Sequence, residues 1–198
     1  MNEPRPDGTI AAEPSLPDKV VVIHETLQAA KVPHAIGGAL ALAYYAEPRT
    51  TVDIDLNLFV ATEQWREVVD ALVQLGVNAG ELDPDALLRD GQCRLWWGSN
   101  PVDLFFDNAP IHEAMRKAVR RAPFAGATIP ILGPEHLAVC KAMFDRPKDW
   151  LDIEQMLLAT EDLDVSEIER WLVQMVGAED FRLRRLGELK EKLAIDSY

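Results

Sequence analysis

The sequence of 198 residues has few cysteines, few aromatic residues and no long apolar run. Its two cysteines, Cys93 and Cys140, lie far apart without a histidine cluster nearby. This argues against a disulfide framework or a zinc site and favours reduced thiols. No apolar stretch approaches a membrane span, and the N-terminus has neither the basic start nor the apolar segment of a secretory signal. We therefore expect a cytoplasmic protein that does not enter a membrane.

Positive charge is also scarce, because the formal net charge is −13. Such a balance argues against broad, non-specific binding to nucleic acid. The basic residues are concentrated in the C-terminal part, so a local basic surface beside an acidic site remains open. With 48% hydrophobic and 27% charged residues, the composition is that of an ordinary folded domain.

The order of predicted elements indicates an α+β fold, with a small mixed sheet flanked by helices and a helical C-terminal part. We expect a disordered tail at 1–16, an α/β core at 17–133, and helices at 134–198 that pack on this core. Hydrophobic periodicity and turn residues place the strands at 34–36, 51–60, 93–97, 102–106, 118–123 and 127–132. The same signals place the helices at 17–31, 39–46, 62–75, 84–88, 109–117, 134–145, 148–159, 165–176 and 179–193.

The most informative stretch is Gly37-Gly38, followed by a strand that carries Asp53 and Asp55. Because side chains alternate along a strand, both acids and Asn57 are predicted to share one face. Two such carboxylates would lie about 7 Å apart at Cα and would repel each other without a cation between them. A solvated strand edge with two acids is the alternative. The core face would hold Val52, Ile54, Leu56 and Leu58.

A third acid, Asp103, lies on a later predicted strand that could pair with the first. Oxygen ligands of this kind suit a hard divalent cation, Mg²⁺ or Mn²⁺, as phosphoryl and nucleotidyl transfer require. In this hypothesis Asp53, Asp55 and Asp103 are the catalytic and metal-binding residues. Gly37 and Gly38 would let backbone N–H groups approach a phosphate, and the helix after them would present its positive end.

Together, Gly37-Gly38 and Asp53-Ile54-Asp55 resemble the signature of the nucleotidyltransferase superfamily of the DNA polymerase β type. The pattern Arg49-x-Thr51-x-Asp53-x-Asp55 is similar to the AbiEii-like branch and its uncharacterised bacterial relatives, and Asp103 falls where the superfamily has its third acid. The resemblance covers most of residues 32–160. It implies Mg²⁺-dependent transfer of a nucleoside monophosphate from an NTP to a hydroxyl group of an RNA (tRNA in toxin relatives), a protein or a small molecule.

The resemblance extends to Lys141 and Lys148, which it implies are nucleotide-binding residues together with Gly37, Gly38, Arg49 and Thr51. On one continuous helix, both lysines could face a triphosphate, with Asp149 or Asp152 orienting them. Pro147 predicts a break in that helix. The alternative is an exposed Lys148–Asp152 pair of little energetic weight. Arg49 could either clamp a phosphate or pair with Asp53.

Two other functions remain open at this level. The fold could be a catalytically inactive binding or regulatory module, such as one member of a toxin–antitoxin pair with a cognate antitoxin as its partner. Alternatively, the acceptor could be an antibiotic that is adenylylated. The presence of all three acids favours an active enzyme over an inactive module.

Overall fold

The computed structural model describes residues 13–194 and contains a mixed sheet with the strand order β3-β4-β2-β1-β6-β5. The neighbours β2 and β4 are parallel, as are β1 and β6, whereas the remaining neighbours are antiparallel. The strands are β1 (His34–Ile36), β2 (Ile54–Ala61), β3 (Gln92–Trp97), β4 (Asn100–Asp107), β5 (Arg120–Phe124) and β6 (Ala127–Ile131).

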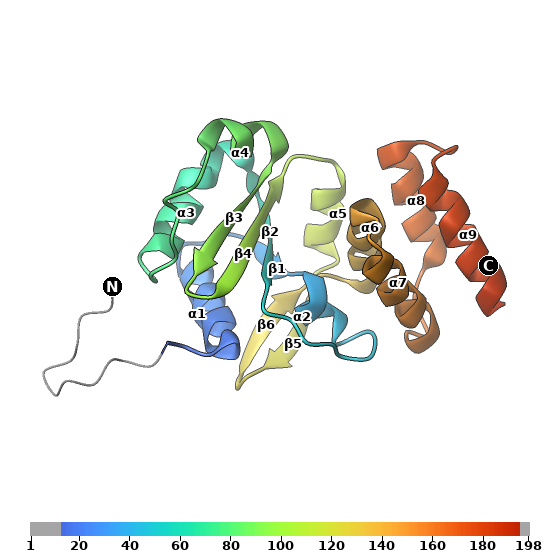
Figure 1. Ribbon diagram of the computed structural model, residues 1–198, viewed down its shortest axis with the longest axis horizontal. Coiled ribbons are helices and arrows are strands. Elements are labelled where there is room, and N and C mark those ends of the chain that lie inside the picture. The colour runs from blue at the N-terminus through green and yellow to red at the C-terminus, as the bar shows by residue number, and fades with distance from the viewer. Residues whose placement is uncertain (1–12, 195–198) are drawn as a thin grey trace, which may run out of the picture.

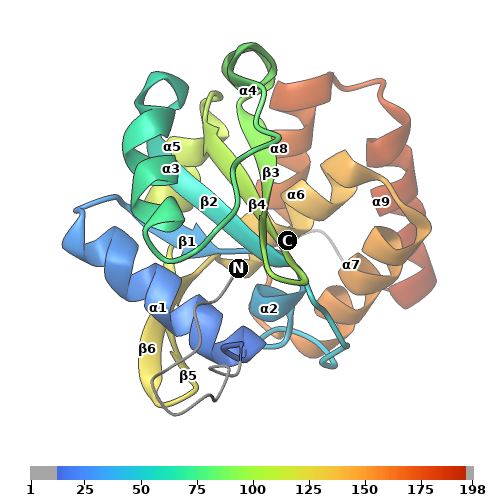
Figure 2. The same ribbon diagram turned by 60° about the vertical axis from the view of Figure 1, so that its left-hand side comes forward.

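Helices cover both faces of this sheet. In Figure 1, α1 and α3 lie on one face, while α5, α6 and α7 lie on the other, with α8 and α9 farther out. Figure 2 shows the β5–β6 hairpin and α4 at opposite ends of the molecule. The helices are α1 (Leu16–Ala29), α2 (Gly38–Leu42), α3 (Trp65–Val73), α4 (Pro84–Asp90), α5 (Ile111–Lys117), α6 (Pro134–Phe144), α7 (Pro147–Ala159), α8 (Val165–Val176) and α9 (Phe181–Leu193).

The predicted α+β class is confirmed, and the C-terminal helices match the predicted ranges to within two residues. Pro147 does end the continuity of α6 and α7, with Asp145 in the left-handed conformation between them. Most of the predicted tail, residues 1–12, lies outside the described residues. Of the rest, Ser15 caps α1 and Glu13 forms an ion pair with Lys19, so these residues belong to the folded structure.

Two local predictions around the acidic strand are wrong. Strand β2 begins only at Ile54, because the backbone N–H of Asp53 donates to the Thr51 hydroxyl in a turn. Val52 therefore does not join the core face and is 56% exposed. The predicted helix 39–46 is also shorter, since α2 ends at Leu42. From Ile54 onward, the predicted core residues Leu56 and Leu58 are fully buried, and Asn57 and Phe59 between and after them are buried as well.

The two parts of the chain are joined through the sheet. Strand β6, which leads into α6, lies parallel to β1, with Ile36 opposite Ile131. The backbone N–H of Leu132 also donates to the carbonyl of Ile36 at 2.9 Å. Only the buried residues Leu132 and Gly133 separate β6 from α6. The glycine turn after β1 and helix α6 therefore start from the same level of the sheet.

Candidate functional site

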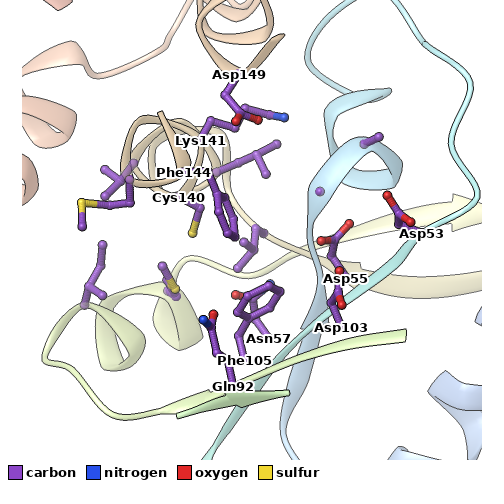
Figure 3. A pocket seen from close by; sticks show the side chains of 18 of the residues that line it. Asp53, Asp55, Asn57, Gln92, Asp103, Phe105, Cys140, Lys141, Phe144 and Asp149 are labelled. Atoms are coloured by element: carbon purple, nitrogen blue, oxygen red, sulfur yellow. The ribbon is translucent and has the colours of Figure 1, made fainter. Parts of the chain in front are cut away.

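The structure brings the three predicted acids together at one end of the central strands. In the register of β2 and β4, Asp55 lies directly opposite Asp103, and Asp53 immediately precedes β2. Figure 3 shows the three carboxylates side by side. The prediction that the strand of Asp103 lies beside that of Asp55 is confirmed.

Asp55 is the acid whose environment differs most from water. Burial, and to a lesser extent the negative charges of Asp103 and Asp53, raise its pKa to about 6. The sequence suggested charge repulsion as the main feature, but burial has the larger effect. A cation placed between these carboxylates would relieve both the repulsion and the loss of hydration.

The two glycines are required by the side chains that approach them. A Cβ atom on Gly38 would lie 1.8 Å from Oδ2 of Asp55, and the residue has a φ of +56°. A Cβ atom on Gly37 would lie 2.6 Å from Nδ2 of Asn57. The Gly37 N–H donates to the carbonyl of Asp55 at 2.9 Å. The turn is therefore built around β2, whatever ligand it also contacts.

Asp103 has a partner that the sequence analysis did not include. Nε and Nη2 of Arg94 donate to the two carboxylate oxygens of Asp103, each at 2.7 Å. Arg94 lies opposite Asp103 in the β3–β4 hairpin, and its side chain is 52% exposed. Only Gly98 and Ser99 separate the two strands, so the hairpin places Arg94 opposite Asp103. A prediction that used a two-residue turn would have identified Arg94 as the partner.

Lys141, Asp152 and Arg49 form a second charged group, which we term the α6–α7 ion-pair cluster. Lys141 is 4% exposed and donates to Oδ2 of Asp152 at 2.7 Å. Nη2 of Arg49 donates to the same oxygen at 3.2 Å. Of the two roles considered for Arg49, the pairing with Asp53 is therefore not found among the described ion pairs. The alternative pair of Lys148 with Asp152 is also not found there.

All nine predicted site residues except Gly37 line one cavity of about 460 Å³. Lys148 is an exposed residue on its wall, and Thr51 lies at the entrance to β2. Arg146, which the sequence analysis did not select, also lines the cavity, and its Nε donates to Asp149 at 2.6 Å. The charged half of the cavity thus combines four acids, the three predicted ones and Asp149, with five basic side chains: Arg49, Arg94, Lys141, Arg146 and Lys148.

A divalent cation fits part of this site. Asp53 and Asp55 offer the hard oxygen donors that Mg²⁺ or Mn²⁺ prefers, and a cation there would offset the burial and the neighbouring charges that raise the pKa of Asp55. Across residues 13–194, no group of three or more His, Cys, Asp or Glu side chains is arranged to hold a metal ion. Both oxygens of Asp103 accept from Arg94, so Arg94 would compete with a metal ion for this carboxylate.

The remaining predictions concern the two cysteines and the membrane. Burial raises the pKa of both thiols, Cys93 and Cys140, to about 12, so both stay protonated at neutral pH. No helix within residues 13–194 is long and apolar enough to cross a membrane.

Comparison with known proteins identifies the fold. No family model matches the sequence, and no curated protein matches it. Among solved structures, the antibiotic-resistance factor ANT(2″)-Ia in solution is 18% identical with a TM-score of 0.58, over 91% of this chain and 97% of that chain. The lincosamide antibiotic adenylyltransferase LnuA, bound to lincomycin, is 14% identical with a TM-score of 0.52, over 72% and 96%.

A crystal structure of ANT(2″)-Ia with adenylyl-2″-tobramycin is also similar, at 18% identity and a TM-score of 0.50, over 88% of this chain and 96% of that chain. This chain therefore has a nucleotidyltransferase-like fold. At these identities the likeness establishes the fold alone. The AbiEii-like assignment rests on the sequence pattern and stays a prediction.

Proposed function

We propose that this protein is a Mg²⁺- or Mn²⁺-dependent nucleotidyltransferase that moves a nucleoside monophosphate from an NTP to a hydroxyl group. The observation that carries the proposal is the meeting of Asp55 and Asp103 on neighbouring parallel strands, with Asp53 beside them and Gly38 directly against Asp55. The fold of the similar antibiotic-modifying proteins supports the same activity.

In this reaction, the acceptor oxygen bonds to the α-phosphorus and loses its proton. The bond between the α-phosphorus and the oxygen that bridges to the β-phosphate breaks, and pyrophosphate leaves. A metal held by Asp53 and Asp55 would neutralise charge on the phosphate oxygens. Asp103, once released by Arg94, would accept the proton or orient the hydroxyl.

The basic side chains have separate tasks in this proposal. Lys148 and Arg146 lie on the cavity wall and would attract the triphosphate. Lys141 and Arg49 already share Asp152, which holds both cations at fixed positions facing the cavity. Gly37 and Gly38 would bring backbone close to the phosphates. Pyrophosphate would therefore leave on the side of the glycine turn and α6.

Three acceptor classes remain: RNA including tRNA, protein, and small molecule. The similar structures ANT(2″)-Ia and LnuA are named for antibiotics, which makes a small-molecule hydroxyl the first acceptor to test. The net charge of −13 disfavours a large nucleic-acid surface. A toxin–antitoxin role and a cognate antitoxin stay predictions, for which a pull-down with the products of neighbouring genes is the direct test.

One observation favours the second candidate, an inactive binding module. Both oxygens of Asp103 accept hydrogen bonds from Arg94. Such a pair is expected where the carboxylate is no longer needed for catalysis. Against this, Arg94 is half-exposed and free to swing into solvent, and Asp53 and Asp55 have no ion-pair partner among the described salt bridges.

The deciding experiment measures acid-dependent label transfer. The protein is incubated with each α-labelled NTP, Mg²⁺ or Mn²⁺, and in turn total tRNA, cell extract and a panel of aminoglycoside and lincosamide antibiotics. Transfer that is lost in the Asp53→Ala/Asp55→Ala variant, but kept in Asp90→Ala, supports the enzyme. Asp90 is a matched control because it is an exposed acid on α4, paired with Arg89. Equal inactivity of wild type and variant would favour the binding module.

A further inference from the structure

We infer that Asn100 is a positioning residue for Asp53, and that Lys19 holds Asn100 in the orientation that this task needs. The inference rests on the proposed function, in which Asp53 and Asp55 hold the metal. The two acids are fixed to the fold in different ways. Asp55 lies within β2, and its carbonyl accepts from the N–H of Gly37 at 2.9 Å. Asp53 precedes β2 and has no partner in the register with β4.

A proline interrupts the ladder of hydrogen bonds beside Asp53. The register of β2 and β4, continued backward from its first pair, would place Val52 opposite Asn100. In a parallel ladder, the Val52 carbonyl would then accept from the backbone N–H of residue 101. Residue 101 is a proline, which has no N–H to donate. The carbonyl next to Asp53 therefore needs a donor from elsewhere.

The side chain of Asn100 supplies this donor. Its Nδ2 donates to the Val52 carbonyl at 2.9 Å, and the residue is buried. The N–H of the same peptide group, which belongs to Asp53, donates to the Thr51 hydroxyl at 3.2 Å. Both polar atoms of this peptide group are thus held by side chains instead of by the sheet. Because the peptide group fixes the Cα atom of Asp53, it sets where the carboxylate lies relative to Asp55.

Lys19 fixes which way the amide of Asn100 faces. Its Nζ donates to Oδ1 of Asn100 at 2.7 Å, and an ammonium group can only donate. The amide nitrogen therefore points toward Val52. Lys19 is 1% exposed, and its Nζ also donates to the Trp97 carbonyl at 2.8 Å and pairs with Glu13. These partners use all the N–H groups of the ammonium, which offsets the cost of burying its charge.

The same contacts tie α1 to the β3–β4 hairpin, so a purely structural role is the alternative. The two roles differ at one bond. The bonds of Lys19 to Asn100 and Trp97 join the helix to the hairpin, whereas the bond from Nδ2 of Asn100 ends on the peptide group of Asp53. A structural role predicts a loss of stability alone. Positioning also predicts a loss of metal affinity in the folded protein, because a displaced carboxylate completes a metal site less well.

The test measures the affinity of the full chain for Mn²⁺ alone, by calorimetry and by the electron paramagnetic resonance signal of the free ion. Urea unfolding is measured alongside. Asn100→Ala should weaken Mn²⁺ binding about 10-fold and raise the Mg²⁺ concentration for half-maximal label transfer by a similar factor. Adding Pro101→Ala restores a backbone N–H beside the Val52 carbonyl. The double variant should therefore recover most of the Mn²⁺ affinity, although the bond to Lys19 stays lost.

Asn108→Ala is the matched control. This asparagine follows the far end of β4, and its Nδ2 also donates to a backbone carbonyl, that of Asp90, at 3.2 Å. Its Mn²⁺ affinity should stay within about 2-fold of the wild type. If Asn100→Ala does not fold, Asn100→Asp takes its place, because it keeps an acceptor for Lys19 and loses the donor to Val52. The added negative charge alone would tighten Mn²⁺ binding, so weaker binding supports the inference.

Unchanged or tighter Mn²⁺ binding in the Asn100 variants overturns the inference and leaves the proposed function standing. A loss in Asn100→Ala that Pro101→Ala does not restore also overturns it, since the loss would then come from the bond to Lys19. A wild type that binds Mn²⁺ but transfers no label would overturn the proposed function alone, because the Mn²⁺ affinities still decide the role of Asn100. If the wild type binds no Mn²⁺, both fail.

Discussion

Two groups of charged side chains face the same cavity and are stabilised in opposite ways. The carboxylates of Asp53, Asp55 and Asp103 are like charges held close together, and the pKa of Asp55 is raised to about 6. In the α6–α7 ion-pair cluster, one carboxylate, Asp152, is shared by two cations. The carboxylate group lowers the free energy of unfolding. In the ion-pair cluster, the charge of Asp152 is balanced by cations of the protein itself.

The difference separates the groups by role. Asp53 and Asp55 have no ion pair among the described residues, and like charges held together in this way are typical of sites that bind a charged ligand. Asp103, by contrast, already has Arg94 as its partner. An internally compensated cluster fixes positions without needing a ligand. We therefore expect the carboxylates to control activity at a cost in stability, and the ion-pair cluster to control both.

The largest expected effect is on activity in Asp55→Asn. The amide keeps the shape of the side chain but loses the charge that would hold a metal, and we expect nucleotidyl transfer to fall by at least roughly 10³-fold. The same variant should be more stable than the wild type at pH 8, because it removes a buried negative charge. Label transfer and urea unfolding measure the two effects. A variant that is inactive and also less stable would contradict the proposed contrast.

Asp152→Ala should be the most destabilising change in the ion-pair cluster. It leaves Lys141 buried without its counter-charge, for an expected loss of about 3–5 kcal/mol in the free energy of unfolding. The double variant Lys141→Met/Asp152→Leu should recover much of this loss, because no fully buried charge is left unpaired: Arg49 also loses Asp152 but is 35% exposed to water. Glu113→Ala, which removes an exposed partner of Arg116, is the control and should change little. Equal losses in the single and double variants would show that packing, not charge, dominates.

The pH dependence of stability should show two opposed contributions. Protonated Asp55 stabilises the fold below its ordinary pKa of 3.8, and this contribution is lost as the pH rises through about 6. Burial lowers the pKa of His34 from 6.5 to about 4, so its contribution is lost as the pH falls from 6.5 to 4. Each shift corresponds to about 3 kcal/mol.

Urea unfolding from pH 4 to pH 8 can separate these contributions. The stability advantage of Asp55→Asn over the wild type should be greatest above pH 6 and should vanish near pH 4. An advantage that does not change with pH would assign the effect to packing.

Arg94→Gln should have the smallest effect on stability. Arg94 is 52% exposed but Asp103 only 15%, so we expect a modest loss of about 1–2 kcal/mol. The variant is informative because it removes the hydrogen-bond partner of Asp103. With Arg94 gone, Asp103 is free to help bind a cation, and the Mg²⁺ concentration for half-maximal activity should fall a few-fold. An unchanged or higher Mg²⁺ requirement would mean that Arg94 does not compete with the metal.

Local sequence patterns predicted most of the elements but not the partners of the charged residues. The four C-terminal helices follow from periodicity, and the pairing of the strands of Asp55 and Asp103 was anticipated. Alternation failed at Val52, where a Thr51 turn delays the strand. The contact of Arg49 with Asp152 spans 103 positions and has no local pattern behind it. Such pairs are fixed by how α7 packs on the core, which periodicity alone does not specify.

The junction between β6 and α6 has a consequence for motion. Substrate capture in many enzymes relies on a hinge of a few residues between rigid parts. Here the only residues available, Leu132 and Gly133, are buried, and Leu132 is hydrogen-bonded to Ile36. We therefore expect β6 and α6 not to move apart. Ligand entry to the cavity would then depend on the movement of side chains such as Arg94 and Phe144. Hydrogen exchange of the Leu132 amide should accordingly be slow and equal with and without nucleotide.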